Sequence, residues 1–373
     1  MPGPLSGLKV IELARILAGP WAGQVLADLG AEVIKVESLD GDDTRRWGPP
    51  FVDNADGSRD AAYYHATNRG KRSVCVDFRE EEGRETVRAL VADADVLIEN
   101  FKVGTLAKYG LDHASLSKLN PRLVYCSITG FGQDGPYAGR AGYDFVVQGM
   151  SGIMSLTGEP SGAPQKIGVA YADIMTGLYA VIGIQAALAE RARTGRGKWV
   201  DMALLDVMVG TLANQAMNYL VSGDSPTRLG NAHPNIAPYE VYPTADGWFI
   251  LAVGNDDQFR RFRDVVGMDD DPRFATNADR VAARADLSAI IAQRTGGWAR
   301  DDLLRALAAE AVPAGPINSL AEAFADPQVI HRGMALRLER DEGPPIPGVR
   351  LPIRFHGEDI PPAGASPALG QGA

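Results

Sequence analysis

Asp173 is the only charged side chain in the apolar run from residue 168 to residue 188. A carboxylate loses hydration when it is buried, so a lone acid there must be paired, hydrogen-bonded, protonated or used in chemistry. Carboxylates also act as covalent nucleophiles. An Asp before a run of helix-forming residues is equally typical of a helix cap, since a helix N-terminus favours the anion. The local pattern therefore leaves a cap and a catalytic acid both open.

Other common catalytic motifs are missing from the sequence. There is no G-x-x-x-x-G-K-[ST] loop, no G-x-G-x-x-G between a strand and a helix, and no G-x-S-x-G elbow. The five histidines are scattered without Cys or His partners at ligand spacing, so we expect no metal site. Asp173 is therefore the leading candidate nucleophile by elimination as well as by its setting.

Two basic segments could hold an anionic ligand. Residues 68–72 carry three cations beside an expected strand, and residues 99–102 follow another, with Lys108 one or two helical turns further on. Lys and Arg side chains and backbone N–H groups at such turns can bind phosphates. A solvated basic face explains most clusters of this kind, and the pattern alone does not decide between the two.

The bulk properties bound the class of protein. With 373 residues, 45% of them hydrophobic, the chain is long enough for about two domains. A net charge of −10 argues against nucleic acid as the main partner.

Cys75 and Cys126 both lie in strand-like runs, which indicates buried thiols in a reducing compartment. The apolar run could span a bilayer by length, but Asp173 and its many Gly and Ala residues favour a buried core helix. We expect a soluble cytoplasmic protein without a signal peptide or a membrane partner.

Strand-like and helical runs alternate in the first third of the chain. We expect strands at residues 8–13, 30–37, 72–77, 95–99 and 123–128, and helices at 21–29 and 80–92. This order predicts an α/β fold with a parallel sheet and helices on both of its faces. Ligands of such sheets bind at the carboxyl ends of the strands.

The distribution of Gly and Pro residues and the changes in local composition along the chain predict three regions. Residues 1–224 would form the first part of a large domain, with a mostly helical segment from 181 to 219. Residues 225–325 combine alternating apolar runs with charged helical ones and would form a smaller α+β domain. Residues 326–373 are strand-like and Pro-rich, and would return to the large domain.

Ten motifs in one order resemble the family III (CaiB/BaiF-type) CoA-transferases, a group that includes formyl-CoA transferase and 2-methylacyl-CoA racemase. They lie at residues 5–13, 17–20, 29–37, 68–73, 98–101, 142–144, 151–158, 172–173, 194–198 and 312–316. The resemblance covers nearly the whole chain. It is highly specific for the family and much less specific for a substrate.

The resemblance implies both a fold and a chemistry. Family members have a Rossmann-like large domain and a small domain, and two chains interlock as a homodimer with the active site at the subunit interface. The acid at the position of Asp173 is their nucleophile, and it carries coenzyme A as an aspartyl-CoA thioester between two carboxylic acids. Neither ATP nor a metal is needed in such an exchange. The implied CoA-binding positions are Arg15, Leu17, Ala18, Val76, Arg79, Asn100, Phe101 and Lys108.

Departures from the family pattern narrow the substrate. Formyl-CoA transferase has Gln where this chain has Leu17, which makes a formyl/oxalyl pair a poor fit. The racemase has His where this chain has Tyr143, so one of the two acid/base groups that racemisation needs is missing. Residues 41–51 and 231–239 are instead similar to succinyl-CoA transferases that act on dicarboxylates such as glutarate.

A dicarboxylate keeps one charged carboxylate that an Arg could bind bidentately. Arg45, Arg46 and His233 are candidates for this contact, while Trp47 could line the acyl pocket beside Tyr143. The two arginines could equally neutralise Asp42 and Asp43, and Trp47 could be a packing residue.

The leading hypothesis is therefore an acyl-CoA:carboxylate CoA-transferase that moves CoA from succinyl-CoA to a dicarboxylate. A 2-methylacyl-CoA racemase or epimerase, and a non-catalytic acyl-CoA-binding protein, are the alternatives.

Overall fold

The computed structural model describes residues 3–356 and 360–372, which divide into two compact units. The first comprises Met1–Ile153, Lys166–Val221 and Pro327–Ala373, and the second comprises Met154–Gln165 and Ser222–Asp326. Residues 154–165, which we expected in the large domain, thus group with the smaller unit.

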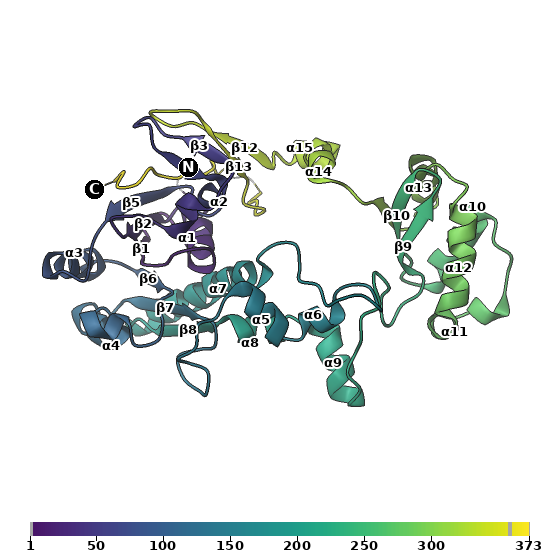
Figure 1. The fold of residues 1–373 in the computed structure, drawn as a ribbon, viewed down its shortest axis with the longest axis horizontal. Coiled ribbons are helices and arrows are strands. Elements are labelled where there is room, and N and C mark those ends of the chain that lie inside the picture. Colours follow the sequence, from purple (N-terminus) through teal and green to yellow (C-terminus); the bar gives the residue numbers. More distant parts are fainter. Residues whose placement is uncertain (1–2, 357–359, 373) are drawn as a thin grey trace. The chain divides into compact units, whose positions relative to one another are not determined.

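Six parallel strands form the sheet of the first unit, and they confirm the predicted α/β class (Figure 1). The strands are β1 (Lys9–Glu12), β2 (Glu32–Glu37), β5 (Lys71–Cys75), β6 (Val96–Glu99), β7 (Val124–Thr129) and β8 (Trp199–Ala203). Their order is β5-β2-β1-β6-β7-β8. Counted along the sheet, this is the doubly wound order 3-2-1-4-5-6, which reverses direction between β1 and β6. A ligand crevice is expected at that reversal, beyond the carboxyl ends of β1 and β6.

Alternate residues of each strand face two different helix layers, so both faces of the sheet are buried. On one face, the side chains of Val10, Ile98 and Cys126 pack under α1 (Ala18–Asp28) and α7 (Tyr171–Thr194). On the other face, Ile11, Leu97 and Tyr125 pack under α3 (Glu81–Ala92) and α4 (His113–Leu119). Both cysteines are free thiols, with Cys126 buried and Cys75 half-buried.

Shorter elements complete the first unit. They are η1 (Asp43–Arg46), β3 (Phe51–Asp53), β4 (Arg59–Ala61), α2 (Ala62–His65), η2 (Leu106–Tyr109), α5 (Asp144–Met150), α8 (Leu204–Gly210), α15 (Pro327–His331), β12 (Ala335–Leu338) and β13 (Ile346–Val349). Helices α6 (Ile153–Leu156) and α9 (Ala213–Ser222) cross the boundaries between the two units. The C-terminal tail lies along the outer edge of β5, where the Ser73 N–H donates to the Gln371 carbonyl at 3.1 Å (Figure 1). This contact covers a strand edge that would otherwise be unpaired.

The second unit has a three-stranded antiparallel sheet in the order β11-β10-β9. Its elements are β9 (Tyr239–Thr244), β10 (Gly247–Ala252), α10 (Asp256–Val266), η3 (Pro272–Phe274), α11 (Asn277–Ala282), α12 (Arg284–Thr295), α13 (Arg300–Ala309), β11 (Ala314–Pro316) and α14 (Leu320–Ala325). Phe249, Phe262, Ile291 and Leu303 are buried at the centre of its own core.

Helix α7 is only partly buried, which corrects the expectation of a core helix. Gly177 brings it close to α1, because a Cβ there would lie 2.7 Å from the Ala18 carbonyl oxygen. On its other side, Ile182 is 62% exposed, and Leu178 and Tyr179 are also open to solvent. It is the one helix among the described residues that is long and apolar enough to cross a membrane, by length and composition alone. The helix thus has one packed face and one apolar face that is open to solvent among the described residues of the first unit.

Candidate functional site

A cavity of about 400 Å³ lies at the strand-order reversal of the large sheet. The loops that follow β1 and β6 form two of its walls, and the segment before α5 and the start of α7 form the others. The lining residues used below are Arg15, Ile16, Leu17, Ala18, Asp43, Asn100, Phe101, Lys102, Arg140, Tyr143, Asp144 and Asp173. The crevice expected from the topology is therefore present, and Asp173 lines it.

Asp173 is the third residue of α7, in the first turn of the helix. Its side chain is half-buried and reaches the cavity. Across residues 3–356 and 360–372, its carboxylate has no hydrogen bond or ion pair to another side chain or to the backbone. The oxygens of Asp173 are thus available to a ligand.

The helix cap is supplied by a different acid. One carboxylate oxygen of Asp144 accepts a hydrogen bond from the Ala172 N–H at 2.8 Å, and a longer one from the Asp173 N–H at 3.4 Å. Ala170, at the N-cap position of α7, offers no side-chain bond. Asp173 is therefore not the cap of its own helix, which removes the simpler of its two explanations.

The environment of Asp173 disfavours its charged form. Burial, and after it the negative charge of Asp144, together raise the pKa of this carboxyl to about 7. At neutral pH a large fraction of Asp173 is still ionised, yet the anion is poorly solvated. A carboxylate with a perturbed pKa in a cavity is a candidate catalytic group.

The loop after β1 is held from both sides. Ile16 adopts a left-handed backbone with φ 72°, which is rare for a β-branched residue. Its N–H faces the buried carboxylate of Asp42 at 3.2 and 3.3 Å. Asn100 ties this loop to the loop after β6, because its amide accepts from the Arg15 N–H at 2.9 Å and donates to the Arg15 carbonyl at 2.7 Å.

The structure brings five of the eight predicted CoA-binding residues to the cavity. Arg15, Leu17, Ala18, Asn100 and Phe101 all line it. The Arg15 guanidinium pairs with Asp43 at 2.9 Å and lies 5.9 Å from the centre of the Phe101 ring.

The other three predicted CoA-binding residues lie outside this cavity. Val76 is buried in the core beneath α3, Arg79 is exposed and paired with Asp77, and Lys108 is exposed on η2. A ligand that extended from Asp173 past Phe101 would have to leave the cavity to meet them.

Arg45 cannot bind a substrate carboxylate, which corrects one of the substrate predictions. Its guanidinium is buried, donates to Glu37 at 2.7 and 2.9 Å, and pairs with Asp60 at 3.0 Å. It also lies 3.7 Å from the centre of the Tyr64 ring. The alternative expectation, that Arg45 neutralises Asp42 and Asp43, is wrong as well, because its acids come from β2 and β4.

The basic segment 68–72 is likewise not a ligand site. Lys71 is fully buried between Glu12, at 2.8 Å, and the Pro20 carbonyl, and Arg69 pairs with buried Asp28. Arg72 is exposed and bonded to Glu32. Two of the three cations thus neutralise buried acids, Glu12 of β1 and Asp28 at the end of α1, so neither a phosphate site nor a solvated basic face describes this segment.

The remaining substrate candidates are arranged differently. Arg46 is exposed and 3.4 Å from Asp43, while Tyr143 lines the cavity with 66% of its surface exposed. Trp47 is half-exposed and packs edge-on against Tyr63, with ring centres 5.3 Å apart. His233 belongs to the second unit, where its ring packs against Tyr239.

The sequence did not single out two residues of the site. Burial raises the pKa of the Tyr63 phenol, and the charges of Asp173 and Asp144 add to the shift, so this side chain faces the same pair of acids. Arg140 lines the cavity and lies over the Tyr137 ring, 4.5 Å from its centre. No ion pair to Arg140 occurs within the described part of the chain. Neither residue lies in one of the motifs identified in the sequence.

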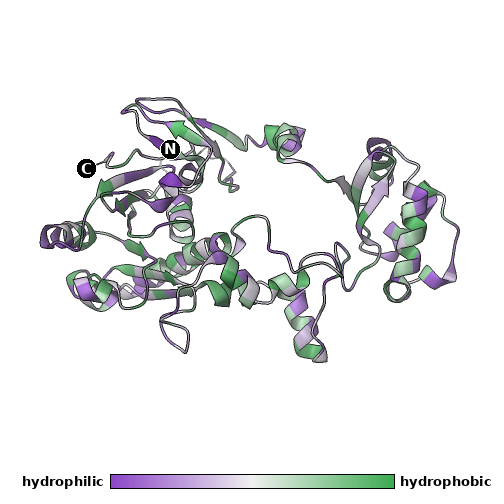
Figure 2. Cartoon of the chain, viewed as in Figure 1, coloured by the Kyte–Doolittle hydropathy of each residue, from purple (hydrophilic) through white to green (hydrophobic). Residues whose placement is uncertain are grey.

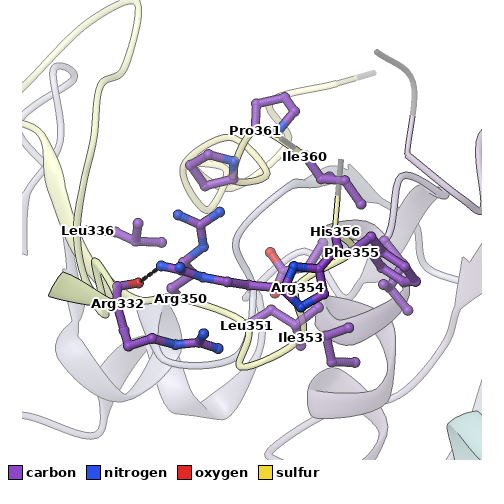
Figure 3. Close-up of a pocket in the computed structure, with 13 residues that line it drawn as sticks. Arg332, Leu336, Arg350, Leu351, Ile353, Arg354, Phe355, His356, Ile360 and Pro361 are labelled. Carbon is purple, nitrogen blue, oxygen red and sulfur yellow. Dashed lines mark hydrogen bonds between the residues drawn. The ribbon is translucent and has the colours of Figure 1, made fainter. Parts of the chain in front are cut away.

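A second cavity, of about 350 Å³, lies at the opposite end of α1 (Figure 3). Its lining includes Arg332, Arg350 and Arg354, together with Asp28 and Leu29 from the last turn of α1 and the residue after it. It shares no lining residue with the Asp173 cavity, which lies at the start of the same 11-residue helix. Since an 11-residue helix is about 16 Å long, these arginines do not contribute to the Asp173 site.

Fold and site together describe an α/β protein with a half-buried carboxylate in a cavity at the reversal of its sheet. The sequence model of CoA-transferase family III matches residues 5–373, and the chain belongs to that family. The resemblance drawn from the motifs is thereby confirmed, as is the assignment of the chain as a CoA-transferase, which acts on CoA thioesters.

Named relatives are similar along most of their length. Succinate–glutarate CoA-transferase of Agrobacterium fabrum is 62% identical over 373 residues, which cover 99% of this chain and 93% of that protein. Succinyl-CoA:glutarate CoA-transferase of Homo sapiens is 39% identical over 375 residues, covering 99% and 84%. A crystal structure of a CaiB/BaiF family protein from Brucella suis superposes with a TM-score of 0.90 at 62% identity, covering 100% of this chain and 97% of that one.

Proposed function

We propose that this protein transfers CoA between succinyl-CoA and a dicarboxylic acid, with glutarate as the acceptor, through a covalent intermediate on Asp173. The observation that carries the proposal is a half-buried carboxylate with free oxygens in the crevice of a family III CoA-transferase fold. The names of the two glutarate-specific relatives support the choice of donor and acceptor.

The first half of the reaction loads CoA onto the enzyme. A carboxylate oxygen of Asp173 attacks the thioester carbonyl carbon, the C–S bond breaks, and CoA leaves as a thiolate with the bonding electron pair. This gives a mixed anhydride between Asp173 and the succinyl group. The thiolate then attacks the Asp173 carbonyl of the anhydride, releasing succinate and forming an aspartyl-CoA thioester.

The second half runs the same steps in the opposite direction. The acceptor carboxylate attacks the aspartyl thioester, which expels the thiolate and forms a new anhydride. The thiolate attacks the acceptor's carbonyl carbon, so the acceptor leaves as its CoA ester and Asp173 returns as a carboxylate. The bonds made and broken balance, and no proton is consumed.

Arg140 is the best-placed cation for the distal carboxylate of the acyl group. It lines the cavity, it has no acidic partner among the described residues, and the Tyr137 and Phe131 rings hold its guanidinium at 4.5 and 5.7 Å. Arg15 already pairs with Asp43, and the buried Arg45 guanidinium already pairs with Glu37 and Asp60. A planar guanidinium fixed on aromatic rings is suited to bidentate binding of a carboxylate. It replaces Arg45 as our candidate for this contact.

The exposed apolar faces of α5 and α7 support the proposal of a homodimer. Phe145 is 58% exposed, Val146 49% and Ile182 62%, and these helices carry apolar colouring in Figure 2. Large contiguous apolar surfaces of this kind mark protein interfaces. We expect a particle of twice 39.8 kDa by light scattering. Ile182→Lys would shift it towards the monomer mass, whereas Leu39→Lys, at an exposed loop position, would leave the mass unchanged.

The central test is the exchange reaction itself. Succinyl-CoA is incubated with a panel of carboxylic acids, and new thioesters are read by mass, with glutaryl-CoA as the expected product. Asp173→Ala should abolish exchange and also the hydroxylamine-sensitive enzyme–CoA adduct. Asp206→Ala removes an exposed acid from the first turn of α8 and serves as the matched control. Full exchange activity in Asp173→Ala would refute the mechanism.

The two alternative functions give different results in the same experiments. A racemase would wash deuterium from solvent into the α-carbon of a 2-methylacyl-CoA without any acceptor acid. A non-catalytic binding protein would bind acyl-CoA but exchange nothing, with or without Asp173.

A further inference from the structure

Asp144 and Gln148 lie one helical turn apart on α5, and both contact the segment that carries Asp173. Asp144 accepts from the Ala172 N–H in the first turn of α7. The Gln148 side chain is fully buried, and its amide oxygen accepts from the Ile167 N–H at 2.9 Å. One short helix therefore binds the start of α7 and the segment that leads into it.

The two side chains are also bonded to each other. The Gln148 amide nitrogen donates to the second carboxylate oxygen of Asp144 at 2.8 Å. Its remaining contact is a long one, 3.5 Å, to the Val169 carbonyl. Each carboxylate oxygen of Asp144 thus has a donor, and both polar atoms of the Gln148 amide are used. Fully bonded polar groups of this kind specify one geometry, because any rotation would leave a buried group without a partner.

We propose that Asp144 and Gln148 act as a clamp that positions the Asp173 carboxylate and keeps its oxygens free for the thioester. The inference rests on the proposed function, and it assigns Asp144 and Gln148 as positioning residues of that reaction.

The reason lies in the exposed N–H groups of a helix start. The first turn of α7 has unpaired donors, and an acid at its third position can fold back to bond them. The Asp173 carboxylate would then accept hydrogen bonds from its own helix and lose nucleophilic character. Because Asp144 occupies the Ala172 and Asp173 N–H groups, these two donors are not available to the Asp173 carboxylate.

A backbone contact next to α5 restricts the position of that helix. Gly130, just after β7, and Gly142, just before α5, are in backbone contact, since a Cβ on Gly130 would lie 2.5 Å from the Gly142 Cα. The sheet therefore fixes the position of Asp144, and Asp144 in turn fixes α7. This chain of contacts connects the nucleophile to the rigid part of the fold.

The test replaces the carboxylate of Asp144, alone and together with the amide of Gln148. Asp144→Asn is nearly isosteric, but its new amide nitrogen faces the Gln148 amide nitrogen, so two donors oppose each other. We expect kcat to fall about 10- to 100-fold, as a displacement near 1 Å can do, with little change in the KM for succinyl-CoA. The double variant Asp144→Asn/Gln148→Glu restores one acceptor opposite each donor, and it should recover most of the lost kcat.

Both variants should melt within a few degrees of the wild type. Under that condition, recovery of kcat in the double variant is a result that a role in fold stability alone would not give. Unchanged kcat in Asp144→Asn, or a double variant no faster than the single one, would overturn the proposal. Asp206→Asn, in the first turn of α8, is the control for a change of charge alone.

A second measurement separates this proposal from the function on which it rests. In Asp144→Ala, amide hydrogen exchange of the peptide spanning residues 167–175 should become at least about tenfold faster, since the loss of the clamp opens the first turn. If exchange speeds up but the wild type transfers no CoA, the proposed function fails and the clamp stands. If the wild type transfers CoA while the peptide exchanges at its normal rate in Asp144→Ala, the clamp fails.

Discussion

The buried carboxylate of Asp42 accepts from the backbone N–H of Ile16 and holds that residue at φ 72°. The same carboxylate lies 2.9 Å from the fully buried Lys35 ammonium. A non-glycine residue in this conformation costs about 1–3 kcal/mol unless its surroundings impose it. The buried Lys35–Asp42 pair therefore supports the strained loop that forms one wall of the site.

Replacement of Asp42 by Ala should weaken both the fold and the site. Lys35 would keep only Glu12 as an acid partner, and breaking one side of a buried pair typically costs about 3–5 kcal/mol. The KM for succinyl-CoA should also rise, because residues 15–18 lose their anchor. Urea unfolding and steady-state kinetics measure the two effects. Asp40→Ala, at an exposed position of the same loop, should change neither, and equal stability of both variants would contradict this account.

The contact between Gly130 and Gly142 should tolerate no side chain. In Gly130→Ala, the new Cβ would lie 2.5 Å from the Gly142 Cα, so α5 and its Asp144 must move. We expect kcat to fall roughly 100-fold, as for other small displacements of a catalytic group. Gly139→Ala is the matched control in the same loop, since nothing lies within 4 Å of its Cβ position. Similar kcat values for the two variants would show that this contact does not position the site.

Asp173 should lower the stability of the protein at alkaline pH. Its pKa is raised by burial, and then by Asp144, from 3.8 to about 7. A raised folded pKa means that the protonated form is favoured in the fold. The stabilisation that the protonated Asp173 carboxyl gives is therefore fully present below pH 3.8, and it is lost as the pH rises through 7. Above pH 7 the fold holds a poorly solvated anion.

Asp173→Asn should consequently have a higher melting temperature than the wild type at pH 8.5, and a smaller advantage at pH 5, where less of the stabilisation of the wild type has been lost. The difference between the two proteins isolates residue 173, because all other ionisable groups are shared. A constant difference in melting temperature across this range would show that Asp173 does not titrate near pH 7.

The sequence predicts what depends on local pattern. Alternating strand-like and helical runs gave the parallel sheet, and the apolar surroundings of Asp173 marked it before any geometry was known. The expected helix ends were close for α3, which runs from Glu81 to Ala92. These features follow from residues near one another in the chain, where periodicity and burial leave a direct signature.

Contacts between distant segments could not be predicted in this way. Arg45 was a candidate for the carboxylate of the substrate or, alternatively, for Asp42 and Asp43, yet its true partners, Glu37 and Asp60, come from β2 and β4. Lys71 was a candidate phosphate ligand because it lies in a basic segment beside a strand, and it instead neutralises Glu12. Whether a charged side chain is free depends on which strands are neighbours, and a linear pattern does not contain that information.

Arg140 should determine the preference for dicarboxylic acyl groups. In Arg140→Gln the guanidinium on the Tyr137 ring is lost, and with it a charge-assisted contact worth about 1.5–3 kcal/mol. We expect the KM for glutarate, and that for succinyl-CoA, to rise roughly 10- to 100-fold. The KM values for pentanoate and butyryl-CoA, which lack the distal carboxylate, should remain within about twofold. Arg122→Gln, an exposed arginine at the other end of β7, is the matched control and should leave all four values unchanged. A uniform rise for every CoA ester would instead assign Arg140 to the CoA moiety, because only that part is common to all of them.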